Sequence, residues 1–380
     1  MRKQDINKLS QPYINSNQTE FDRRFDSAIG ADVPSAGILV EQIFGDFDAN
    51  SFGIWWWNSL PMEERILISD YLYQCTSDIE TNLVEAKLHY LEWLGAREKF
   101  NEKIANVISR DPNGNLRMKM PPSKSPSDDL PYKLEKMHIC GFFRAIGSSL
   151  DCLAASIIGV LGLPVSLRRS DIAKAEKALL KVSTLANQGS QLQTNFRHFF
   201  EDVKKSSGTE DWLEWADQYR NMFVHRGRRI TRYQINPRKN PLYDSTDQWI
   251  PRAESNIHLA KYPDRSDIEA FIKSKDITLN EDAERTLIGI FNSCRNLNEN
   301  ICERLVSIWK ERRANPQLLE QPQNQWDDKI RSCKFVGYDS NAESPNADIG
   351  IVNPMLSRRM LSASVDDNNR NLWKNSKWNQ

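Results

Sequence analysis

Apolar residues recur at helical spacing through most of the chain between residues 61 and 313. The stretch 61–110 is rich in helix formers and has no Pro after Pro61, so it predicts two helices or one long one. No stretch alternates apolar and polar residues for long, and the strand–helix–strand rhythm of a doubly wound sheet is absent. We therefore predict an all-α fold, a helical bundle. The further predicted helices cover residues 132–160, 170–187, 190–205, 211–227 and 280–313.

Polar and Pro-rich stretches divide this helical pattern into three parts. Residues 111–131 hold five Pro and an Asn-Gly pair, which predicts a connector. The predicted division is an N-terminal helical region with its connector (1–131), a helical domain (132–313) and a polar tail (314–380). Within the domain, residues 228–279 predict a long loop insertion between helices.

The composition excludes several classes of protein. The chain has 51 basic and 51 acidic residues, and this neutrality excludes a basic coat that grips nucleic acid over the whole surface, though not a local basic site. The longest uncharged apolar run, 152–167, contains Gly and Pro and is shorter than the roughly 20 residues that span a bilayer. No apolar segment of a signal peptide follows Met1. We predict a cytoplasmic protein with no membrane partner.

No motif indicates a metal or a cofactor. The six Cys include no C-x-x-C pair, and the five His include no H-x-x-x-H, so reduced cysteines and no metal site are predicted. The common phosphate-binding loop, the dinucleotide fingerprint and the G-x-S-x-G elbow are absent. Asp78 with Glu85-Ala86-Lys87 resembles a nuclease string but lies within a predicted helix, which favours surface charges. For Trp55-Trp56-Trp57, core packing is favoured over stacking on a ligand.

One segment carries candidate chemistry, the predicted helix that leads through Arg220 and Asn221 to His225. RNA holds its own nucleophile, the 2′-OH, so cleavage needs a base, an acid and positive charge on the phosphate. His suits acid–base work near neutrality, Arg presents a planar charged fork that matches phosphate oxygens, and Asn can orient either group. Positions five apart on a helix point about 140° apart. Arg220 and His225 would therefore converge if the helix unwinds near Gly227, or if two copies meet in a dimer.

Basic residues follow this segment, with a charge of +6 over residues 226–239. They could track a phosphate backbone. A structural reading stays open: Arg220 would pair with Asp217, His225 would sit at a helix C-terminus, and the basic run would be a solvated loop. The candidate RNA-binding residues are Arg226, Arg228, Arg229 and Arg232.

The segment Arg220-Asn221-Met222-Phe223-Val224-His225 resembles the motif of the HEPN superfamily (higher eukaryotes and prokaryotes nucleotide-binding domains). Residues 142–155 are also similar to the first long helix of some bacterial members. The resemblance implies a metal-independent endoribonuclease that leaves 2′,3′-cyclic phosphate ends. Arg220 and His225 of two protomers would form its composite site, with Asn221 assisting and no cofactor.

The resemblance also implies a biological role, that of a toxin or an effector of antiphage defence, with an antitoxin or sensor protein as partner. Arg144, Ser148 and Asp151 would lie near the site, although packing and helix-surface roles are favoured for them. Two alternatives stay open: a catalytically inactive HEPN module that binds RNA or a partner protein, and a purely structural helical scaffold.

Overall fold

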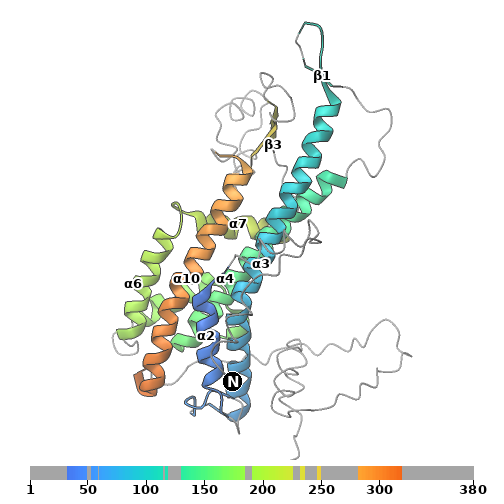
Figure 1. Cartoon of the computed structure of the whole chain (residues 1–380). Helices are drawn as coiled ribbons and strands as arrows, with labels where there is room; N and C mark the ends of the chain where they lie inside the picture. Colours follow the sequence, from blue (N-terminus) through green and yellow to red (C-terminus); the bar gives the residue numbers. More distant parts are fainter. Residues whose placement is uncertain are drawn as a thin grey trace, which may run out of the picture.

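The structure, a computed structural model, describes residues 32–48, 53–58, 60–113, 116–118, 130–184, 191–225, 232–235, 246–249 and 281–318. Within these residues the chain forms a bundle of α-helices, which confirms the predicted all-α fold (Figure 1). The α-helices are α2 (Pro34–Gly45), α3 (Met62–Val107), α4 (Leu130–Leu161), α5 (Ile172–Thr184), α6 (Gln191–Ser206), α7 (Trp212–His225) and α10 (Ala283–Ala314), with short 3-10 helices η3 (Leu167–Arg169) and η5 (Pro316–Leu318).

Helices α3 and α4 form the longest packed pair of the bundle. The predicted stretch 61–110 is a single helix, α3, and it begins directly after Pro61, where Pro is tolerated. Helix α4 begins at Leu130, so Pro131 lies in its first turn and the connector is slightly shorter than predicted. One continuous apolar core joins α2, α3, α4 and α10 with the smaller helices. This core runs across residue 131, where the domain division stays a prediction.

Helix α4 is the apolar centre of the bundle. It is long and apolar enough to cross a membrane, yet 78% of its most apolar stretch is buried inside the protein. Such burial is that of the central helix in a soluble bundle. Of the apolar run 152–167, residues 152–161 lie in α4, which ends before Gly162 and Pro164.

Helix α2 was not predicted from the sequence, which shows only a short apolar segment there. No local side chain caps its first turn. Instead, the Glu299 carboxylate of α10 accepts hydrogen bonds from the backbone N–H of Ser35 (3.1 Å) and from its hydroxyl (2.7 Å). The Glu80 carboxylate of α3 accepts from the N–H of Val33. The capping groups thus come from other helices, which satisfies the free N–H groups at the helix start.

The Trp run after α2 packs into the core, as predicted. Trp56 and Trp57 are buried, while Trp55 is exposed. The Trp56 ring lies 4.9 Å from that of Trp309 of α10. Beside them the buried guanidinium of Arg312 donates to the Val160 carbonyl at the C-terminal end of α4 and lies over the Trp56 ring. A buried cation here satisfies carbonyls that the helix itself leaves unpaired.

Helices α5, α6 and α7 make up the part of the bundle that holds the candidate site. Helix α5 begins with a cap, because the Asp171 carboxylate accepts from the N–H of Lys174 (2.7 Å). Between α6 and α7 the chain turns at Asp211, whose φ of 57° is unusual for a residue with a side chain. This turn directs α7 back across α4 (Figure 1).

Within the described ranges, four short strands form two antiparallel pairs outside the core. Strands β1 (Ile108–Arg110) and β2 (Leu116–Met118) lie at the far end of α3 (Figure 1). Strands β3 (Arg232–Ile235) and β4 (Thr246–Trp249) belong to the predicted insertion, with Arg232 opposite Trp249. The rest of that insertion, and the tail after Leu318, lie outside the described residues.

Candidate functional site

Helix α7 carries the predicted motif and packs on α4 through aromatic residues. Trp212 and Tyr219 are buried. The Tyr219 ring stacks on Trp215 with ring centres 4.5 Å apart, and it lies 5.1 Å from the ring of Phe143 of α4. This packing fixes the rotation of α7 about its own axis. The next residue, Arg220, is thereby placed at the side of α4.

Arg220 is held by a carboxylate of the neighbouring helix. Its Nη2 lies 2.5 Å from Oδ2 of Asp151, and its Nη1 lies 3.4 Å from Oδ1, the two-pronged geometry typical of an Arg–carboxylate pair. The Asp217 carboxylate, one turn back on α7, lies 3.8 Å from Nη1. The Arg220 side chain remains 25% exposed and that of Asp151 30%. The guanidinium is therefore fixed in place but reachable from solvent.

Gly147 makes room for Arg220 on α4. A Cβ added at Gly147 would lie 2.2 Å from Cδ and 2.4 Å from Nε of Arg220. Gly147 and Asp151 are four residues apart, so they lie on the same face of α4. The absence of a side chain at Gly147 leaves room for the aliphatic part of Arg220, and Asp151, one turn later, binds its guanidinium.

Arg220 and Asp151 line a pocket of about 370 Å³ between α4, α5 and α7. Burial raises the pKa of the Asp151 carboxyl, an effect that the adjacent Arg220 opposes. The pocket lining holds more acid than base, with five carboxylates against two cations. The carboxylates belong to Asp151, Asp171, Glu176, Glu214 and Asp217, and the cations to Lys204 and Arg220.

The other predicted site residues are only partly described. Asn221 is exposed at the edge of the pocket, and its amide donates to the Asp217 carboxylate (3.0 Å). Helix α7 continues to His225, whose backbone is helical and whose side chain lies outside the description. Arg232 belongs to strand β3, again without a described side chain. The remaining predicted RNA-binding residues, Arg226, Arg228 and Arg229, lie outside the described residues.

Of the three α4 residues considered near the site, only Asp151 reaches it. Arg144 is 63% exposed and pairs with Glu85 of α3 (2.6 Å), so it has the helix-surface role favoured from the sequence. Ser148 does not line the pocket. The direct contact between Asp151 and Arg220 was not predicted, and Gly147 was not singled out. The spacing of Gly147 and Asp151, one turn apart, is the signal that could have indicated it.

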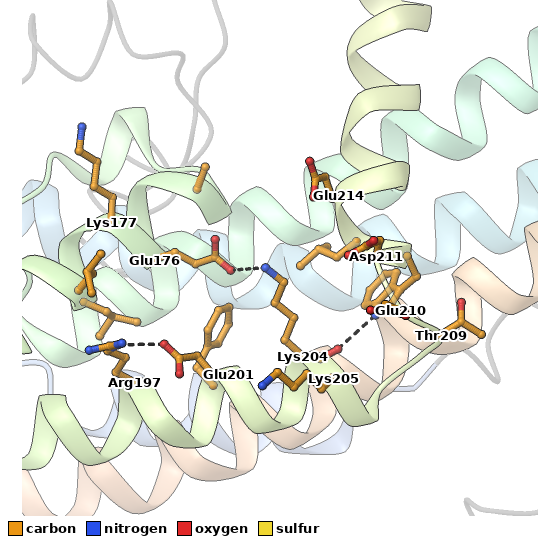
Figure 2. Close-up of a pocket in the computed structure, with 16 residues that line it drawn as sticks. Glu176, Lys177, Arg197, Glu201, Lys204, Lys205, Thr209, Glu210, Asp211 and Glu214 are labelled. Carbon is orange, nitrogen blue, oxygen red and sulfur yellow. Dashed lines mark hydrogen bonds and ion pairs between the residues drawn. The ribbon is translucent and has the colours of Figure 1, made fainter. Parts of the chain in front are cut away.

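A larger pocket, of about 900 Å³, lies next to the first (Figure 2). It is formed by α5, α6 and the turn that leads into α7. Its lining shares Glu176 and Lys204 with the Arg220 pocket, and these two side chains form an ion pair of 2.7 Å. Sequence reasoning missed this pocket, because its residues come from two separate amphipathic helices.

The nuclease-like string, the histidines and the cysteines have structural roles or no metal-binding arrangement within the described residues. Glu85 and Lys87 lie within α3, as predicted, and the Lys87 ammonium lies over the Phe291 ring. The Nδ1 atom of His89, on the same helix, lies 3.1 Å from the Nδ1 atom of His138 of α4. The five cysteines of the described ranges form no disulfide with one another. Within those ranges, no group of three or more His, Cys, Asp or Glu could hold a metal ion.

The fold and the site thus define a helical bundle with a fixed, accessible arginine in a small acidic pocket. Comparisons with known protein families, with curated proteins and with solved structures gave no match. The HEPN resemblance therefore rests on the sequence alone.

Proposed function

We propose that the chain is a HEPN-type endoribonuclease that cleaves RNA without a metal, with Arg220 and His225 as catalytic residues and Asn221 assisting. One observation carries the proposal: the Arg220 guanidinium is fixed by Asp151 at an accessible pocket, on the same helix as Asn221 and the backbone of His225. A preorganised cation is what the crowded phosphate of the transition state requires.

The proposed reaction uses the RNA 2′-OH as nucleophile. His225 takes the 2′-OH proton as the oxygen attacks phosphorus. The bond from phosphorus to the 5′-oxygen then breaks, and an acid protonates that leaving oxygen. Arg220 stabilises the charge on the non-bridging oxygens. The products are a 2′,3′-cyclic phosphate end and a 5′-OH end.

The shape of α7 is the reason for proposing a composite site in a homodimer. The helix remains regular through position 225, so positions 220 and 225 point about 140° apart within one chain. Two copies of α7 meeting across a two-fold axis would bring Arg220 of one chain to His225 of the other. The second His225 would then be available as the acid. Light scattering tests this step, because a monomer at the active concentration would exclude it.

The charge of the pocket sets a condition on this proposal. A phosphate diester that enters would meet five carboxylates and two cations. It therefore needs further positive charge, and the proposed source is Arg226, Arg228, Arg229 and Arg232. Replacing these four by Ala should weaken RNA binding and lower its dependence on salt.

The test is RNA cleavage in the presence of EDTA. Purified full-length protein should cut single-stranded RNA, and Arg220→Ala and His225→Ala should each abolish the cut. Arg144→Ala and His198→Ala are the matched controls, because both residues lie outside the Arg220 pocket and His198 is exposed. The proposed role, a cytoplasmic toxin or antiphage effector restrained by an antitoxin or sensor, predicts growth arrest on expression. Arg220→Ala should relieve that arrest.

A second candidate function is an inactive HEPN module that binds RNA or a partner protein. It is favoured by one observation, that Arg220 is already neutralised by Asp151 and Asp217. Asp151→Asn separates the two functions. In a nuclease the variant loosens Arg220 and lowers the cleavage rate. In an inactive module the variant frees the Arg220 cation, so its affinity for RNA rises. Neither the native protein nor the variant then cleaves RNA.

A further inference from the structure

Two cysteines meet where α3 packs against α4. Cys75 of α3 and Cys152 of α4 are far apart in the sequence, yet a hydrogen bond joins their thiol groups. The side-chain amide of Asn82 also donates to Sγ of Cys152, over 3.6 Å. Because the two sulfur atoms are already in contact, a disulfide between them needs little movement of the helices.

The register of the two helices holds the cysteines together. On one side of them, Oγ1 of Thr76 lies 2.9 Å from Oγ of Ser156. On the other side, the Ser149 hydroxyl donates to the Ile79 carbonyl over 3.0 Å. Ser149, Cys152 and Ser156 follow one another at helical spacing and therefore share one face of α4. Both hydrogen bonds are buried, so they fix this face of α4 against α3 and keep the sulfur atoms opposite each other.

Small oxidants can reach this pair from solvent. Cys75 and Cys152 are partly exposed, whereas Cys294 and Cys302 of α10 are fully buried. Cys140 is also partly exposed, but it lies roughly 18 Å from Cys152 along α4, at 1.5 Å per residue. Among the described cysteines, Cys75 and Cys152 thus combine access from solvent with a thiol partner in contact.

The surroundings of the pair give its two thiols different roles. The hydrogen bond to Cys75, burial, and the charges of Asp78 and Asp151 all raise the pKa of Cys152 above its ordinary range. Cys152 therefore keeps its proton and donates it toward the sulfur of Cys75. The sulfur that accepts this hydrogen bond is the one left to attack an oxidant, since a nucleophilic sulfur is one that carries negative charge.

We propose that Cys75 and Cys152 form an oxidation site, at which a peroxide converts the two thiols into a disulfide that links α3 to α4. The sulfur of Cys75 first attacks one oxygen of hydrogen peroxide. The O–O bond breaks, the thiol proton joins the leaving hydroxide as water, and Cys75 becomes a sulfenic acid. The sulfur of Cys152 then attacks that of Cys75, the S–O bond breaks, and the Cys152 proton leaves with the hydroxide as a second water. Two electrons pass from the sulfur atoms to the peroxide, and a dithiol reductant reverses the change.

The disulfide has a consequence for the candidate site, which rests on the proposed function. Asp151, the residue before Cys152 on α4, binds the Arg220 guanidinium at 2.5 Å. A sulfur–sulfur bond is about 2.05 Å long, so the sulfur atoms must come closer than their hydrogen bond holds them. This approach draws the turn of α4 that carries Cys152 toward α3 and moves Asp151 with it. Oxidation should therefore displace Arg220 and lower the rate of RNA cleavage.

Disulfide mapping tests the oxidation site without depending on any activity. The native full-length protein is reduced, freed of reductant and treated with a small excess of hydrogen peroxide. The remaining thiols are then blocked with iodoacetamide, and the protein is digested without reduction. Mass spectrometry should find the peptide of Cys75 linked to that of Cys152, and dithiothreitol should separate the two. Disulfides only between other cysteines, or the lack of any disulfide, would overturn the proposal.

Single substitutions test the assigned roles of the two sulfur atoms. In Cys152→Ser the sulfenic acid has no thiol to react with, so a dimedone probe should label Cys75 after peroxide treatment. In Cys75→Ser the probe should leave Cys152 unlabelled. Cys140→Ser is the matched control, because it removes a partly exposed thiol from the same helix, and it should form the disulfide like the native protein. Label on Cys152 in Cys75→Ser, with none on Cys75 in Cys152→Ser, would overturn the assigned order of the two steps.

RNA cleavage in EDTA separates the effect on Arg220 from the proposed function. Peroxide should lower the cleavage rate of the native protein roughly tenfold, and dithiothreitol should restore it. Cys75→Ser should cleave at the same rate with and without peroxide. Unchanged cleavage by protein in which the disulfide has been mapped would overturn the effect on Arg220. Should the disulfide form while the reduced protein leaves RNA intact, the oxidation site stands and the ribonuclease proposal fails.

Discussion

The substitution Gly147→Ala changes the candidate site without replacing any proposed catalytic residue. The new methyl carbon would lie 2.2 Å from Cδ of Arg220, whereas carbon atoms in contact stay roughly 3.5–4 Å apart. The arginine stem must therefore shift by more than about 1 Å. A shift of this size cannot keep both contacts between the guanidinium and Asp151, of 2.5 and 3.4 Å.

The expected cost follows from three contributions. Overpacking at a tight contact costs about 1–3 kcal/mol. The partly exposed Arg220–Asp151 pair adds up to about 1 kcal/mol when it is lost. Replacing a helical Gly by Ala returns about 0.5–1 kcal/mol through the lower entropy of the unfolded chain. We expect Gly147→Ala to lower the free energy of unfolding by about 1–2 kcal/mol.

Gly289→Ala on α10 is the matched control, because an added Cβ there meets nothing within 4 Å. This variant should gain about 0.5–1 kcal/mol from helix propensity alone. Urea unfolding followed by circular dichroism measures both. Under the proposed function, displacing Arg220 by about 1 Å should also lower cleavage roughly 100-fold. Equal stabilisation by the two substitutions would refute the described contact between Gly147 and Arg220.

Three further predictions concern the stability of the bundle. Glu299→Ala removes the cap that α10 supplies to α2, so the first turn of α2 should lose hydrogen-exchange protection and the free energy of unfolding should fall by about 1 kcal/mol. Unchanged protection would contradict the cap. Arg312→Ala leaves the C-terminal carbonyls of α4 and the Trp56 ring without their partner, so it should lower the free energy of unfolding in urea by about 3 kcal/mol or more. A decrease below about 1 kcal/mol would show that the guanidinium is not buried there. Burial lowers the pKa of His89 and of His138 from the ordinary 6.5; at His89, Arg144 lowers the pKa further, whereas Glu85 and Glu92 raise it. The folded protein therefore binds fewer protons than the unfolded chain, so the free energy of unfolding should fall as the pH drops below 6.5. The substitution His138→Gln should make this fall smaller.

The sequence predicted the helices whose apolar stripe is long and continuous. Helices α3, α4 and α10 lie where the spacing of their apolar residues predicts them, because the residues that form each buried stripe belong to one continuous segment. Helix α2 escaped prediction because its cap, Glu299, lies far away in the sequence and becomes adjacent only in the folded bundle. Its local signals, Pro34 in the first turn and a short apolar run, are weak without these distant contacts.

The candidate site was only half predictable for a similar reason. Arg220 was singled out from its place on α7, yet the local reading paired it with Asp217, one turn away. The stronger partner is Asp151 of α4, at 2.5 Å against 3.8 Å. That choice depends on how α7 is rotated against α4, which the packing of Tyr219 on Phe143 decides. Spacing within one helix cannot report contacts that two helices create together.

The central claim is that Arg220 and His225 cleave RNA. The most direct measurement incubates the full-length protein with a single-stranded RNA in EDTA and identifies the new ends by mass spectrometry. The account predicts 2′,3′-cyclic phosphate ends from the native protein, from Arg144→Ala and from His198→Ala, and none from Arg220→Ala or His225→Ala. Intact RNA with the native protein, or the same ends from Arg220→Ala, would contradict it.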